Sequence, residues 1–210
     1  MMGANPVVHI VDDDEAVRRS LAFMLGSAGL AVRVYESARA FLDCLDDVQC
    51  GCLVTDIRMP EMTGIELLAR IKGRTPYLPA IVITGHGDVK LAVEAMKAGA
   101  IDFIEKPFDE RAILDAVKAA LEQGGGETDE DLAAVTERIA SLSERERQVL
   151  EGLLAGQANK VIANVHGISP RTVEVYRANL MAKMQARSLS ELIRMAILAQ
   201  VPVSSGRATR

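Results

Sequence analysis

Residues 7–14 read VVHIVDDD, an apolar run of strand length that leads directly into three aspartates. Four further short apolar runs occur before residue 123: AVRVY (31–35), CLVT (52–55), AIVIT (80–84) and IDFIE (101–105). Stretches with helical periodicity alternate with these runs, at about 14–28, 37–46, 64–72, 87–98 and 109–122. Because strands that alternate with helices pair in parallel, we predict an α/β unit with a five-stranded parallel sheet and helices on both faces.

Polar side chains stand at the carboxyl ends of four of these strands. They are Asp12 and Asp13 after the first strand, Asp56 at the third, Thr84 at the fourth and Lys106 after the fifth. The carboxyl ends of parallel strands share one edge of the sheet, so these residues are expected to meet there. Clustered carboxylates raise each other's pKa values, and a hard divalent cation such as Mg²⁺ relieves their repulsion.

This set of residue types predicts phosphoryl transfer. Asp56 would be the oxygen nucleophile and would form an acyl phosphate. Mg²⁺ and the Lys106 ammonium would neutralise the transferred group, and the Thr84 hydroxyl could donate a hydrogen bond to a phosphoryl oxygen. The alternative is that an aspartate after a strand merely caps a helix or forms a turn, which is the role expected of Asp14. Four matching strand ends together favour the functional interpretation.

The second half of the chain is predicted to be helical. Gly124–Gly126 and the acidic run after them form a flexible joint, and a helix is expected at about 129–140. Ser143 with Glu146 three residues later forms a capping box for the next helix. Further helices are predicted at about 160–166, at 170–184 behind Pro170, and to about residue 199.

The C-terminal segment is basic. Residues 155–210 carry eight Lys or Arg against two Asp or Glu, although the whole chain has a formal net charge of -5. A short helix, a turn with a glycine and a longer helix within 159–184 are the elements of a DNA-binding helix-turn-helix. An apolar seam is expected from Val161, Ile162, Val165, Ile168, Val173, Leu180 and Met184. The alternative is an ordinary helical hairpin with solvated basic residues.

If the longer helix enters a major groove, its exposed residues divide into two sets. Near base edges we predict Thr172, Glu174, Val175 and Ala178. Near phosphates we predict Lys160, Arg171, Arg177 and Lys183.

The first half resembles the receiver domain of bacterial two-component response regulators. The motifs are VDDD (11–14), TDIRMPEMTG (55–64), VITGHG (82–87) and EKPF (105–108). The resemblance implies a flavodoxin-like fold over residues 5–122, with Asp56 as the acceptor of a phosphoryl group from a sensor histidine kinase. It also implies Mg²⁺, for which Mn²⁺ could substitute, bound by Asp12, Asp13, Asp56 and the backbone carbonyl of Arg58.

The same resemblance implies a switch and a dimer. Thr84 and Phe103 match the hydroxyl and aromatic positions whose coupled movement reports phosphorylation in that family, although the family often has Tyr or His at the aromatic position. The homodimer formed on phosphorylation would use the fourth helix and fifth strand, roughly Val89–Ala98 and Ile101–Phe108.

The second half resembles the four-helix output domain of the NarL/LuxR class. The segments are SERERQVL (143–150), NKVIA (159–163) and ISPRTVEVYRANLMAKM (168–184), with Ala158 and His166 as departures from the usual pattern. With the receiver, the chain is most similar to the FixJ/NarL family. The resemblance implies a partly helical linker at 123–141, a DNA-binding domain at 142–200, and a regulator that activates transcription through promoter DNA and RNA polymerase, often of oxygen-responsive or nitrogen-fixation genes.

Composition excludes several classes of protein. With 49% hydrophobic and 25% charged residues the chain is not fully disordered. It has no uncharged apolar stretch long enough for a membrane span, and its three cysteines suit a reducing cytoplasm. A haloacid-dehalogenase-like phosphatase remains an alternative, but it needs a second acid two residues after Asp56, where Arg58 stands. A phosphorelay carrier without DNA output is the other alternative, and residues 141–200 argue against it.

Overall fold

The structure is a computed structural model that describes residues 6–74, 78–85, 89–122 and 129–201. The chain divides into two compact units, one built mainly from residues before 127 and the other mainly from residues after it. Two predicted segments lie outside the described residues: the joint at 124–126, and residues 86–88, which include the end of the VITGHG motif (82–87).

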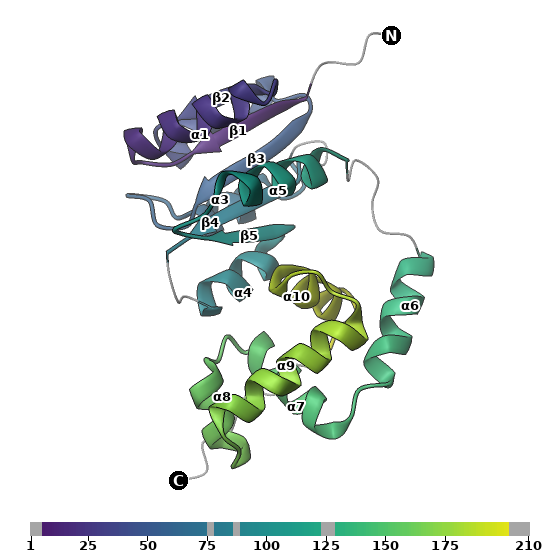
Figure 1. The fold of residues 1–210 in the computed structure, drawn as a ribbon. Coiled ribbons are helices and arrows are strands. Elements are labelled where there is room, and N and C mark those ends of the chain that lie inside the picture. The colour runs from purple at the N-terminus through teal and green to yellow at the C-terminus, as the bar shows by residue number, and fades with distance from the viewer. Residues whose placement is uncertain (1–5, 75–77, 86–88, 123–128, 202–210) are drawn as a thin grey trace. The chain divides into compact units, whose positions relative to one another are not determined.

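The first unit contains a five-stranded sheet in the order β2-β1-β3-β4-β5, with every neighbouring pair parallel (Figure 1). The strands are β1 (Val7–Val11), β2 (Ala31–Tyr35), β3 (Gly51–Asp56), β4 (Ala80–Thr84) and β5 (Asp102–Glu105). The prediction of a five-stranded α/β unit is confirmed, and each strand lies within a residue of its predicted range. All five carboxyl ends therefore lie along one edge of the sheet.

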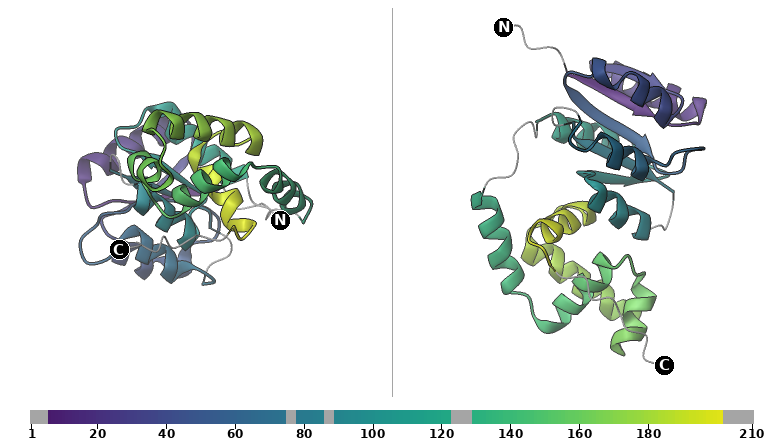
Figure 2. Two further views of the ribbon diagram at one scale, coloured as in Figure 1. Left: turned by 90° about the horizontal axis from the view of Figure 1, so that it is seen from below. Right: turned by 180° about the vertical axis from the view of Figure 1, so that it is seen from behind.

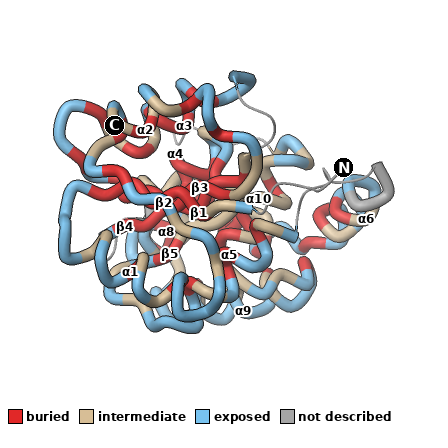
Figure 3. Tube along the Cα trace, turned by 90° about the horizontal axis from the view of Figure 1, so that it is seen from above, coloured by how far each residue is buried: buried red, intermediate tan, exposed pale blue. Residues whose placement is uncertain are grey.

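Helices cover both faces of this sheet (Figure 2). They are α1 (Glu15–Ser27), α2 (Ala38–Asp43), α3 (Gly64–Ile71), α4 (Val89–Ala98) and α5 (Glu110–Glu122), with a short 3-10 turn at Leu45–Asp47. One face packs on α1 and α5 through a core that includes Val8, Ile10, Leu25, Ile83 and Ile113. The central strands are buried along most of their length (Figure 3), as expected of parallel strands with two covered faces.

The helices begin where local side chains satisfy their free N–H groups. Asp14 caps α1 by accepting from the amide of Ala16 at 2.8 Å, so its expected capping role is confirmed. Thr63 and Glu66 form a capping box at the start of α3. This start is crowded, because a Cβ on Gly64 would lie 2.2 Å from the carbonyl oxygen of Asp56. Glycine is therefore required where the loop after Asp56 returns to the sheet.

The second unit is helical. Its helices are α6 (Asp129–Ala140), α7 (Glu144–Leu154), α8 (Asn159–His166), α9 (Pro170–Met184) and α10 (Leu189–Leu198). The Ser143–Glu146 capping box forms as predicted, and Ser169 caps α9 with Pro170 in its first turn. Gly167 ends α8 in the left-handed conformation, φ 64°, which costs glycine little.

Two details of the helical prediction differ from the structure. Val161 and Val165 are 46% and 63% exposed, so they do not belong to the apolar seam, whereas Ile162, Val173 and Met184 are fully buried. The helix α6, predicted as part of a linker, packs against α9 and α10 and buries Val135 and Ile139. Periodicity identified the helices but could not show which apolar side chains the tertiary packing would cover.

Candidate functional site

The Lys106 ammonium brings two aspartates together at the carboxyl edge of the sheet. Its Nζ lies 2.5 Å from Oδ1 of Asp56 and 3.3 Å from Oδ2 of Asp12. The three residues come from β3 and from the ends of β1 and β5, and they are 44 to 94 positions apart in sequence. Both aspartates are buried, with 2% of Asp12 and 7% of Asp56 exposed. The sequence-based expectation that these three side chains meet is therefore correct.

Backbone and side-chain contacts fix each carboxylate. The second oxygen of Asp56 accepts from the amide of Arg58 at 2.5 Å. Asp12 accepts through Oδ1 from the amide of Asp14 at 2.9 Å, and its carbonyl oxygen accepts from Arg18 Nη1 at 2.7 Å. The loops after β1 and β3 thus hold the carboxylates in place before any ligand binds.

Burial and ion pairing set the protonation of this edge. Burial raises the pKa of Asp12 above its usual value, although the Asp14 amide and the Lys106 ammonium partly offset it. Burial alone would lower the pKa of Lys106, but its hydrogen bond to Asp56 and the two carboxylate charges outweigh that effect and raise it. Lys106 is therefore a firmly held cation between two carboxylates.

The other predicted receiver residues are Thr84, Asp13 and Phe103. Of these, Thr84 is tied to the cluster through its backbone, because its carbonyl oxygen accepts from the Lys106 amide at 2.8 Å. Thr84 ends β4 and is 3% exposed, and its hydroxyl donates to the carbonyl of Gly85 at 3.4 Å. Asp13 is exposed beside the buried Asp12. Phe103 lies half-buried on β5, two residues before Glu105, whose strand partner is Thr84.

The donors at this edge suit a hard cation. Among the described residues no three acidic, histidine or cysteine side chains gather as a complete metal cluster. Asp12 and Asp56 nevertheless share one cationic neighbour, and both present only oxygen atoms. Mg²⁺ commonly binds through one or two carboxylates with backbone oxygens, phosphate and water completing the shell. The two carboxylates therefore fit Mg²⁺ better than a softer metal.

In the second unit, α8 and α9 form the predicted helix-turn-helix. Arg177 Nη1 on α9 donates to Oδ1 of Asn159 on α8 at 2.9 Å, which ties the two helices together. The N-cap position of α8 is held by Ala158, which makes no side-chain cap bond. The Asn159 side chain instead belongs to the contact between the helices.

The predicted DNA-contacting residues differ in how free their side chains are. Lys160, Arg171, Glu174, Val175 and Ala178 are exposed, and Val175 is an exposed large apolar side chain. Thr172 and Arg177 are half-buried. The Lys183 ammonium lies 2.7 Å from Oε2 of Glu146, so it already has a carboxylate partner.

Comparison with known proteins divides the chain in the same way. Residues 8–118 match the family described as response regulator receiver domain. Residues 140–196 match bacterial regulatory proteins, luxR family. The chain belongs to the response regulators. It combines a receiver domain with a luxR-type DNA-binding output domain, and it regulates transcription.

Two curated relatives show how far the similarity extends. The chain is 59% identical over 196 residues to the transcriptional regulatory protein FixJ of Azorhizobium caulinodans, covering 92% of this chain and 93% of that protein. It is 57% identical over 192 residues to FixJ of Rhizobium meliloti, covering 90% and 94%. This response regulator is therefore FixJ-like along both of its domains, and the phosphatase and carrier alternatives are not favoured.

A solved structure supports the same assignment. Full-length FixJ from B. japonicum matches with 50% identity and a TM-score of 0.55, covering 94% of this chain and 98% of that one. The family is one of regulators rather than catalytic enzymes. Among the described residues, no helix is both long and apolar enough to cross a membrane.

Some of the contacts at both sites were not foreseen from the sequence. They include the Arg18 bond to the Asp12 carbonyl, the Arg177–Asn159 bond and the Lys183–Glu146 ion pair. The partners of Lys183 and Arg177 are 37 and 18 positions away, and no spacing rule connects them. The basic charge of the segment was a correct signal of DNA binding, but it did not show which cations already have an acceptor within the domain, as the 42% exposed Lys183 side chain has in Glu146.

Proposed function

We propose that Asp56 is the residue that accepts the phosphoryl group. The observation that carries this proposal is the arrangement of its carboxylate at the end of β3, with one oxygen on Lys106 and the other on the Arg58 amide. An Asp56 oxygen forms the new bond to phosphorus while the bond to the donor imidazole of a sensor histidine kinase breaks, and its electron pair leaves with that imidazole.

Neighbouring groups stabilise the charge on the transferred phosphoryl group. The Lys106 ammonium is already at hydrogen-bond distance from Asp56. It therefore stands beside the oxygen that receives the phosphoryl group and can donate to an equatorial phosphoryl oxygen there. Asp12, Asp13, Asp56 and the Arg58 carbonyl would hold Mg²⁺, or Mn²⁺ in its place, and the metal would supply further positive charge. Within the described part of the chain the Thr84 hydroxyl makes one long bond, to the carbonyl of Gly85 at 3.4 Å, which a turn of the hydroxyl toward a phosphoryl oxygen would replace.

The test is the mass of the full chain after incubation with acetyl phosphate and Mg²⁺. We expect one phosphoryl group on Asp56, lost on Asp56→Asn substitution and nearly lost without the metal. A phosphorylated Asp56→Asn chain, or an unmodified wild type, would contradict the assignment.

Phosphorylation is proposed to produce a homodimer through α4 and β5, within Val89–Ala98 and Ile101–Phe108. Movement of Thr84 toward the phosphoryl group, with Phe103 following, would alter this face. Support comes from the register, which pairs Thr84 with Glu105 and Val82 with Phe103 on adjacent strands. Light scattering should show dimers of the phosphorylated chain, whereas donor-dependent dimers of Asp56→Asn would refute the coupling.

The output domain is proposed to bind promoter DNA with α9 in the major groove. Thr172, Glu174, Val175 and Ala178 would lie near base edges, and the exposed Val175 suits a thymine methyl group. Lys160, Arg171 and Arg177 would contact phosphates. The expected outcome is activation of transcription in the cytoplasm together with RNA polymerase. Binding of a promoter duplex that weakens steeply with added salt would support this interface.

A further inference from the structure

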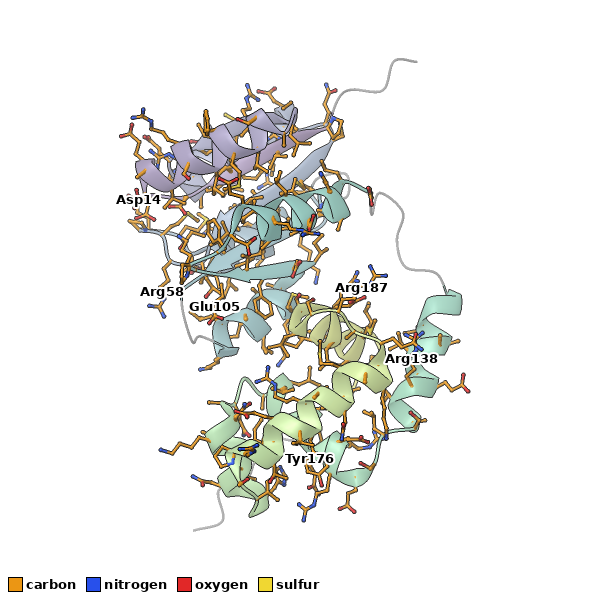
Figure 4. All side chains as sticks on the ribbon, in the orientation of Figure 1. Asp14, Arg58, Glu105, Arg138, Tyr176 and Arg187 are labelled. Atoms are coloured by element: carbon orange, nitrogen blue, oxygen red, sulfur yellow. The ribbon has the colours of Figure 1, made fainter. Side chains whose placement is uncertain are left out.

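Two helices hold the C-terminal end of α9. From α7, Glu146 binds the Lys183 ammonium at 2.7 Å. From α6, Arg138 Nη1 donates to the carbonyl oxygen of Met184, the last residue of α9, at 3.3 Å. Figure 4 shows Arg138 on α6. A cation at a free helix-terminal carbonyl satisfies that carbonyl and interacts favourably with the helix dipole.

The Glu146 carboxylate is an internal anchor. The residue is 4% exposed, and the same Oε2 atom accepts from the amide and hydroxyl of Ser143, each at 2.8 Å. The Lys183 bond is the main reason that the pKa of Glu146 is lowered. Removing Lys183 would leave a buried carboxylate without its cation, which is costly.

The helix α6 is itself held by buried side chains and by a hydrogen bond from α7. Val135 and Ile139 are buried, with 8% and 7% exposed. At its C-terminal end Arg147 Nη2 of α7 donates to the carbonyl of Ile139 at 3.1 Å. The helix that opens this unit in chain order is thus bound to α7 at its end and to α9 through Arg138.

We propose that Lys183 and Arg138 are positioning residues that set the orientation of α9 for base recognition, and that Lys183 does not contact DNA phosphate. This inference rests on the proposed DNA binding. Base readout depends on side chains held in one geometry at the groove floor. The helix α9 is held near its middle by the bond from Arg177 to Asn159 and at its C-terminal end by these two cations. Because Arg138 joins α6 to the C-terminal end of α9, a displacement of α6 would also displace α9.

The salt dependence of DNA binding separates positioning from phosphate contact. The probe is a duplex that the unsubstituted full chain enriches from a random pool, with a shuffled duplex for comparison. Arg171→Gln, on an exposed arginine, is expected to reduce the log–log salt slope by about 0.9, as the loss of one phosphate contact does. Lys183→Met is expected to weaken specific binding roughly tenfold with the slope unchanged.

The second measurement is the DNA affinity of a double variant that lacks both charges of the Lys183–Glu146 ion pair. Glutamine can replace glutamate in a capping box, so Glu146→Gln added to Lys183→Met removes the unpaired carboxylate and keeps the Ser143 contacts. The double variant should recover most of the lost affinity and also serves if the single variant does not fold. A reduced slope for Lys183→Met or the double variant, or no loss of affinity in Lys183→Met, would overturn the inference.

Arg138→Met provides an independent test, with Glu137→Gln on the same helix as the matched control. We expect Arg138→Met to lower the ratio of specific to shuffled-duplex affinity several-fold, with the affinity for the shuffled duplex unchanged, and Arg138→Lys to restore part of that ratio. An equal ratio in Arg138→Met and Glu137→Gln would contradict the role of Arg138. If the unsubstituted chain enriches no duplex at all, DNA binding itself fails, and this inference fails with it.

Discussion

The two domains build their sites in opposite ways. In the receiver, Asp12, Asp56 and Lys106 come from distant strands and meet as charges that are largely buried. In the output domain, the predicted DNA-contacting residues come from one stretch of 24 residues, 160–183, and most are exposed. The receiver site therefore depends on the whole sheet, whereas the reading surface depends on the placement of one helix.

The largest effect is expected from a substitution at Gly64, where the backbone passes close to the Asp56 carbonyl of the receiver site. In Gly64→Ala the new Cβ would meet the Asp56 carbonyl at 2.2 Å, so the loop after β3 must move. We expect a loss of about 3 kcal/mol in the free energy of unfolding and poor phosphorylation. Gly26→Ala is the matched control, because a Cβ there meets nothing within 4 Å. Urea unfolding of both variants measures the difference, and equal stabilities would contradict the packing argument.

Acid should destabilise the receiver through His9. This residue is 2% exposed, its Nδ1 lies 3.1 Å from the Tyr35 hydroxyl, and its Nε2 has no hydrogen-bond partner among the described residues. Burial, with a smaller contribution from Arg33, lowers the pKa of His9 from 6.5 to about 4. The unfolded chain therefore takes up a proton first as the pH falls, so the His9 contribution to stability is present above 6.5 and is lost toward pH 4.

This loss amounts to about 3 kcal/mol between those limits. In His9→Phe, which keeps a ring beside Tyr35 and Phe41, the receiver transition in urea should depend much less on pH over this range. A wild-type receiver equally stable at pH 7 and pH 4.5 would show that His9 is not the group responsible.

Asp12 should show a smaller effect of opposite sign. Because burial raises the pKa of Asp12, its ionised form is unfavourable in the folded state at neutral pH. Asp12→Asn is therefore expected to stabilise the receiver by about 1 kcal/mol at pH 7. The gain should shrink as the pH falls through the raised pKa, since the wild-type carboxyl is then protonated. A destabilised variant at pH 7 would mean that the Lys106 pair outweighs the cost of burial.

The smallest effect is expected on the surface of the output domain. Val165→Ser should change the free energy of unfolding by less than about 0.5 kcal/mol, because the side chain is 63% exposed. Val173→Ala, at a fully buried position on α9, should cost about 2 kcal/mol. Thermal unfolding of the two variants checks which of these valines belongs to the apolar seam. A loss of stability in Val165→Ser as large as that in Val173→Ala would mean that Val165 is a core residue.

Sequence reasoning reached the receiver site because topology determines it. Once five strands are parallel, their carboxyl ends share an edge, and Asp12, Asp56 and Lys106 must converge there. It also placed the cap at Ser143, since this cap uses a contact between residues three positions apart.

It could not identify the partners of Lys183 and Arg138. These depend on how helices pack, and helical periodicity does not determine which cation finds an internal acceptor. The exposure of Val161 and Val165 escaped prediction for the same reason, because a stripe of apolar residues can be wider than the surface that covers it.

The packing of α6 bears on how hybrid regulators are assembled from this protein. A fusion that joins a foreign sensor module at residue 142 would discard Val135 and Ile139 and leave the Met184 carbonyl without Arg138. A junction before residue 129 carries the whole helix along, with its apolar face and its arginine. The transferable cassette therefore begins at residue 129, thirteen residues before residue 142, where the sequence-based prediction starts the DNA-binding domain.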